Sequence, residues 1–146
     1  MRSREQVVWD FVQAWLAKAQ SDLRVAEILL GEASELAEES GFHCQQSAEK
    51  HMKAYLVRHQ IEFSKTHDLA VLRRLIGQRD ERLADRLAFA DWLTPFGVEF
   101  RYPGEMPEVD RETAGRALAD ARRIGALILE ALGEYLGRGR PESQGV

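Results

Sequence analysis

The chain has few of the residues that interrupt or cross-link a helical domain. Its one cysteine, Cys44, has no partner for an intrachain disulfide, which fits a reducing cytoplasm. All four prolines come after residue 94, so no proline interrupts helix formation before that point. No apolar run approaches the roughly 18 residues of a membrane helix, and the start of the chain does not fit a secretory signal. These absences lead us to expect a cytoplasmic protein with no membrane segment.

The chain also lacks an excess of positive charge. Its net charge is -4, so no overall field draws it to nucleic acid, and any phosphate must be bound by a local basic patch. Its 146 residues are a usual length for one domain and can bury a core without disulfide or metal.

Helix-forming residues dominate, and apolar side chains recur at helical spacing. This spacing predicts helices over residues 4–33, from the break at 32–41 to about 59, ahead of Gly77, over 80–94 and over 111–137. Ser64 or Thr66 should cap the third helix, Pro95 should stop the fourth, and Asp110 should cap the last. We therefore expect an all-α fold, an up-and-down antiparallel bundle of four to five helices over residues 1–137. Residues 138–146 are expected to form a disordered tail.

The four histidines are spaced regularly, at residues 43, 51, 59 and 67. Steps of eight residues turn a helix by about 80 degrees, so His43, His51 and His59 spiral around the axis instead of converging on a metal. The glycine-rich phosphate loops GxxxxGK[ST] and GxGxxG are missing, and no strained nucleophile elbow is present. We expect neither a metal nor a cofactor, although a nucleotide such as ATP could be a ligand.

Amide and charged side chains offer a better candidate for a site. One face of the second helix carries Gln46, Glu49, Lys50 and Lys53, three or four residues apart. Lys65 and His67 come where the third helix should begin, and free amides at a helix start favour an anion. The alternative interpretation has Glu49 and Lys53 as an exposed ion pair, with Thr66 serving only as a cap.

Arg101 and Tyr102 form a second unusual element, between an apolar segment and Pro103. An arginine offers a planar fork for phosphate, and a tyrosine offers a ring for stacking. The alternative is structural, with Tyr102 covering the edge of the core and Arg101 binding carbonyls at a helix end.

Several of these elements, taken in order, resemble the HEPN domain, the higher eukaryotes and prokaryotes nucleotide-binding family. They are SDL at 21–23, FHCQQSAEK at 42–50, KAYL at 53–56, KTHDL at 65–69 and RYP at 101–103. The resemblance covers roughly residues 12–136. It implies a helical bundle that forms a homodimer through its long helices. It also implies a minimal nucleotidyltransferase as partner, in toxin–antitoxin-like pairs, and a site for nucleotide or RNA at the dimer cleft.

Many HEPN members are metal-independent ribonucleases that use an arginine, four to six further residues and a histidine on a late helix. No histidine of this chain has an arginine at that spacing, and the last predicted helix has no histidine. The form of this motif that ends in a tyrosine is missing too. We therefore do not expect the chain to be an enzyme by the usual arrangement.

The prediction is a nucleotide-binding accessory protein in which Lys53, Lys65 and Arg101 hold phosphate oxygens. Gln46 and His67 would donate or accept hydrogen bonds, and Tyr102 would stack on a base or line the cleft. Two alternatives remain open. One is an RNA endonuclease with a displaced pair, Arg101 and His67, as its catalytic residues. The other is a helical interaction module without a ligand.

Overall fold

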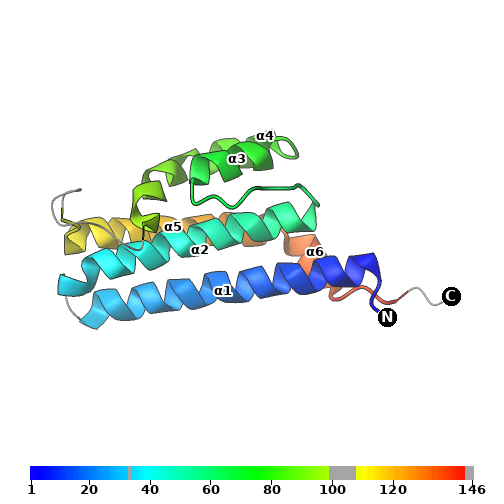
Figure 1. Cartoon of the computed structure of the whole chain (residues 1–146), viewed down its shortest axis with the longest axis horizontal. Helices are drawn as coiled ribbons and strands as arrows, with labels where there is room; N and C mark the ends of the chain where they lie inside the picture. The colour runs from blue at the N-terminus through cyan, green and yellow to red at the C-terminus, as the bar shows by residue number, and fades with distance from the viewer. Residues whose placement is uncertain (33, 99–107, 144–146) are drawn as a thin grey trace.

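A computed structural model describes residues 1–32, 34–98 and 108–143, which form helices and connecting segments with no strand among them (Figure 1). Three long helices, α1 (Arg4–Glu32), α2 (Ala37–Arg58) and α5 (Arg111–Ala131), run along the length of the molecule. The short helices α3 (Leu69–Gly77) and α4 (Glu81–Arg86) lie together along one side. The all-α bundle predicted from the sequence is confirmed.

The central helix is α2, which packs against α1, α3, α5 and a 3₁₀ segment, η2 (Ala88–Gly97). Consequently α2 is buried on several sides, and even its polar residues Gln45, Ser47, Glu49 and Lys53 are enclosed. A polar side chain in such a place needs a hydrogen-bonding partner, because burial without one is costly. The position of α2 therefore decides where a polar site can form.

Helix α1 follows the predicted range closely. The stripe that includes Val12, Ala19 and Ala26 faces the core, and all three residues are fully buried. The rest of the predicted stripe, including Trp15 and Leu23, packs partly buried against it.

The N-cap of α3 is Asp68, so the prediction of Ser64 or Thr66 was wrong. The Asp68 side chain accepts a hydrogen bond from the Ala70 amide at 2.9 Å. Thr66 Oγ1 instead accepts from the Asp68 amide at 3.1 Å, one step before the helix. The helix begins at Leu69, so the residue directly before it holds the cap position. The prediction of Asp110 as the cap of α5 is confirmed by its bond from the Thr113 amide at 2.7 Å.

The predicted helix over 80–94 is also wrong in part. The α-helix ends at Arg86, and the 3₁₀ segment η2 continues through Pro95 to Gly97. A 3₁₀-helix has three residues per turn, which puts residues three apart on one face. The buried residues Leu87, Ala90, Leu93 and Phe96 have that spacing, so burial favours the tighter turn over the α-helix.

The last predicted helix is divided in two. Helix α5 ends at Ala131, Leu132 follows as a break, and α6 (Gly133–Arg138) comes next to the start of α1 (Figure 1). The disorder of residues 138–146 stays a prediction. Of these residues the structure describes 138–143, and there Gln6 Nε2 donates to the Pro141 carbonyl at 3.0 Å. Among the described helices, none is both long and apolar enough to cross a membrane.

Candidate functional site

The carboxylate of Glu49 is the centre of a polar cluster on α2. Its Oε2 accepts from Lys53 Nζ at 2.9 Å, and its Oε1 lies 2.7 Å from His67 Nδ1. An ionised carboxylate can only accept hydrogen bonds, so the proton lies on His67 Nδ1. Only 4% of the Glu49 side chain is exposed. One buried acid therefore joins a turn of α2 to the segment that leads into α3.

Two glutamines extend this cluster. Gln45 Nε2 donates to the His67 carbonyl at 2.8 Å and lies 3.4 Å from Glu49 Oε1. Gln46 Nε2 in turn donates to Gln45 Oε1 at 2.7 Å. We call Gln45, Gln46, Glu49, Lys53 and His67 the Glu49 cluster. Its hydrogen bonds hold both the ring and the backbone of His67 against α2.

The backbone of η2 comes very close to Gln45. A Cβ atom added at Gly97 would lie 2.5 Å from Gln45 Cδ, closer than such atoms approach. Gly97 therefore gives Gln45 the room it needs to reach His67 and Glu49.

The ammonium of Lys53 is enclosed by aromatic rings as well as by the acid. Its Nζ lies 5.4 Å from the centre of the Trp15 ring and 5.6 Å from that of Phe63. Ring faces attract cations, and a cation removed from water also needs a counter-charge. The alternative of an exposed Glu49–Lys53 pair is wrong, because both side chains are more than nine-tenths buried.

The residues predicted for a nucleotide site are brought together only in part. Glu49 joins Lys53 to His67, and Gln46 reaches them through Gln45. His67 is held at Nδ1 while 68% of its side chain is exposed. Lys65 lies two residues earlier, exposed, with no hydrogen bond or ion pair to the described part of the chain. Arg101 and Tyr102 lie outside the described residues.

A second buried acid, Asp22, joins α1 to α2. It accepts hydrogen bonds from Lys50 Nζ and from His43 Nδ1, the latter at 2.8 Å. Sequence reasoning missed the roles of Asp22 and Glu49. The signal for Asp22 was present, because its spacing from Ala19 and Ala26 puts it within the buried stripe.

The surroundings of Cys44, His51 and His59 indicate structural roles. Burial raises the pKa of the Cys44 thiol to about 12, so it is not a thiolate near neutral pH. Burial also lowers the pKa of His51, which is 1% exposed and lies 3.0 Å from the Ser47 carbonyl through Nδ1. Burial, with help from Arg79 and Arg58, lowers the pKa of His59 to about 4. Within the described ranges, no three His, Cys, Asp or Glu residues are grouped so as to hold a metal.

The fold and the cluster together define a class of protein, an antiparallel helical bundle with a buried acid that fixes a largely exposed histidine. The family model of the HEPN domain matches residues 12–132. The match covers most of the chain, which therefore belongs to the HEPN domain family. No curated protein and no solved structure matches the chain.

Proposed function

We propose that the protein binds a nucleotide through His67 and Lys65 and serves as an accessory subunit of a minimal nucleotidyltransferase. The observation that carries the proposal is the hydrogen bond between the buried Glu49 carboxylate and His67 Nδ1. It fixes the ring while the rest of His67 stays exposed to a ligand. A histidine fixed in this way can hydrogen-bond a phosphate oxygen, and the lysine beside it adds positive charge.

The other residues predicted for the nucleotide site do not contact the ligand in this proposal or remain predictions. Lys53 and Glu49 position His67, because the Lys53 ammonium is already enclosed by the acid and two rings. Gln46 supports the same arrangement through Gln45. That Lys53 and Arg101 hold phosphate, and that Tyr102 stacks on a base, stay predictions.

Calorimetric titration with ATP, other nucleotides and short RNA tests the binding. We expect His67→Ala and Lys65→Ala to weaken binding, whereas Arg82→Ala, which removes an exposed cation on α4, should leave it unchanged. A folded wild-type protein that gives no heat with any of these ligands would contradict nucleotide binding. A gene for a small nucleotidyltransferase beside this one, and its co-purification with the protein, would support the partnership.

We further propose a homodimer formed through the long helices, as is frequent in this family. Helix α1 exposes the large apolar side chains Phe11 (56%) and Ile28 (47%), which a second copy would cover. Sedimentation equilibrium should give a dimer for the wild type and a monomer for Phe11→Glu. A wild-type monomer at all concentrations would exclude this arrangement.

An RNA endonuclease is the second candidate, favoured by the Glu49–His67 contact. A carboxylate that orients an imidazole is a common arrangement for general acid–base catalysis. Cleavage of labelled RNA should then disappear in His67→Ala, while cleavage that persists would indicate a contaminating nuclease or another site. If His67→Ala lowers the melting temperature and alters neither binding nor cleavage, the bundle is an interaction module without a ligand.

A further inference from the structure

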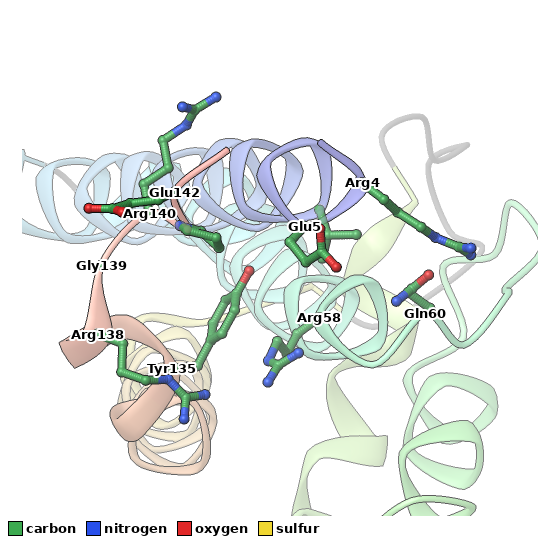
Figure 2. Close-up of a pocket in the computed structure, with 11 residues that line it drawn as sticks. Arg4, Glu5, Arg58, Gln60, Tyr135, Arg138, Gly139, Arg140 and Glu142 are labelled. Carbon is green, nitrogen blue, oxygen red and sulfur yellow. The ribbon is translucent and has the colours of Figure 1, made fainter. Parts of the chain in front are cut away.

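A hollow of about 460 Å³ lies at the end of the bundle where the start of α1, the end of α2 and α6 meet (Figure 2). Its lining includes Arg4, Arg58, Tyr135 and Arg138, and we call it the arginine hollow. No residue of the Glu49 cluster lines it. Its volume falls in the range of small-molecule sites in proteins.

Tyr135 forms a fixed wall of this hollow. The guanidinium carbon of Arg58 lies 4.0 Å from the centre of the Tyr135 ring, and the Trp9 ring lies 5.1 Å from it. Stacking uses the flat face of a guanidinium and leaves its N–H edges free to donate. Arg58 makes no hydrogen bond or ion pair to the described part of the chain. The stack therefore orients donors that have no acceptor.

The other arginines of the hollow differ in how they are paired. Arg140 forms a two-pronged contact with Asp10, with Nε 3.0 Å from one carboxylate oxygen. Arg4 and Arg138, like Arg58, have no carboxylate within ion-pair distance among the described residues. Two acids, Glu5 and Glu142, also line the hollow but form no ion pair there. Arg4, Arg58 and Arg138 thus line one hollow, and their guanidinium groups have no carboxylate partner among the described residues.

The hydroxyl of Tyr135 is a further unused donor. It is buried and has no hydrogen-bond partner among the described residues, and Figure 2 shows it pointing toward α1 near Glu5. Burial raises the pKa of Tyr135, while the charges of Arg58 and Arg138 oppose that rise. The group is therefore protonated at neutral pH, and both arginines are close enough to act on it.

We propose that the arginine hollow binds the phosphate group of a small phosphorylated molecule, with Arg58 and Arg138 donating to its oxygens. Guanidinium groups suit phosphate because their paired N–H groups match two of its oxygens. Arg4 adds charge at the side of α1. This site is separate from the one that contains His67.

Titration calorimetry of the full chain with inorganic pyrophosphate tests this proposal. We expect binding at the hollow, with its affinity lowered at least tenfold in Arg138→Gln. Arg74→Gln removes an equally exposed cation on α3, outside the hollow, and should leave the affinity unchanged. Glu5→Gln should strengthen binding, because it removes a negative charge from the lining.

A second measurement places the ligand even if a variant fails to fold. In the wild-type protein, the side-chain Nε–H resonances of Arg58 and Arg138 should shift on adding pyrophosphate, and that of Arg74 should not. The same shifts of Arg58 and Arg138 should appear in His67→Ala, because no residue of the Glu49 cluster lines the hollow, and this separates the site from the proposed nucleotide site. The absence of binding, an equal loss in Arg74→Gln, or equal binding of citrate would each overturn the proposal.

Discussion

Two cations on α2 lie against aromatic rings, and their surroundings differ in one respect. Lys53 lies beside Trp15 and has the buried carboxylate of Glu49 as its partner. Arg58 stacks on Tyr135, one turn further along, and has no acid within ion-pair distance among residues 1–32, 34–98 and 108–143. A compact ammonium is strongly hydrated and needs a counter-charge when it is buried. A guanidinium is more weakly hydrated and can be partly buried without an acidic partner. The comparison shows why Lys53 is paired within its own chain, whereas Arg58 keeps hydrogen-bond donors for a ligand.

The largest effect should come from removing the counter-charge of Lys53. Glu49→Ala leaves a buried ammonium without a partner and should lower the free energy of unfolding by about 3 kcal/mol or more. Urea denaturation measures the loss. The double variant Glu49→Leu with Lys53→Met should recover most of it, because no unpaired charge then remains. A single variant as stable as the wild type would show that Lys53 reaches water or another acid.

A smaller loss should follow from crowding the same cluster. Gly97→Ala puts a methyl group where Gln45 lies and should cost about 2 kcal/mol through overpacking. Gly115→Ala is the matched control, because nothing lies within 4 Å of the added atom. A methyl group there should stabilise α5 by about 0.5 to 1 kcal/mol. Thermal denaturation of both variants distinguishes the two outcomes, and equal effects would contradict the close approach of η2 to α2.

Removing a polar group from the arginine hollow should raise the free energy of unfolding, whereas the two changes in the Glu49 cluster lower it. The Tyr135 hydroxyl is buried without a partner in the described part of the chain, so Tyr135→Phe should raise the free energy of unfolding by about 1 kcal/mol. The same variant should bind pyrophosphate more weakly if the hydroxyl serves as a donor to it. A loss of stability in urea would mean that the hydroxyl already has a partner in solution.

The smallest effect should be the change of stability with pH that comes from His59, which lies close to positive charges. His59 has its pKa lowered to about 4 by burial, Arg79 and Arg58, with Asp80 opposing, and its ring packs on Tyr55. The unfolded chain, with an ordinary histidine pKa of 6.5, binds this proton first, so stability should fall as pH drops from about 7 to about 4. His51 acts in the same direction.

Because His59 is partly exposed, its own share should stay below about 1 kcal/mol. Urea denaturation over this pH range should show a smaller slope in His59→Gln. In Arg58→Gln, NMR titration should show a raised pKa of His59. An unchanged pKa there would mean that Arg58 does not act on this ring.

The sequence predicted the long helices better than the short ones. The start of α1, the range of α2 and the Asp110 cap follow from helical spacing and local chemistry, and the structure agrees. The prediction of an α-helix after Arg86 is wrong. The buried residues there are three apart, which favours a 3₁₀-helix, and they are Leu87, Ala90, Leu93 and Phe96. Local propensity alone does not choose between these periods in a short apolar segment.

For the site, the sequence identified residue types but not their partners. Gln46 and Lys53 were chosen from spacing and His67 from its place before the third helix, and the structure joins them through Glu49 and Gln45. The sequence left open an exposed pair of Glu49 and Lys53, because nothing near them in the sequence reveals that Trp15 and Phe63 lie against Lys53. The arginine hollow was not predicted, since its members come from the start, the middle and the end of the chain.

The sequence alone determined an all-helical chain of the HEPN family, because periodic apolar residues and short motifs are local properties. Only the tertiary structure decided which charges are neutralised and which stay free. A carboxylate neutralises a cation when the two come within a few ångströms of each other. That distance depends on how α1, α2 and the segments around η2 and α6 pack, and no single stretch of sequence contains it.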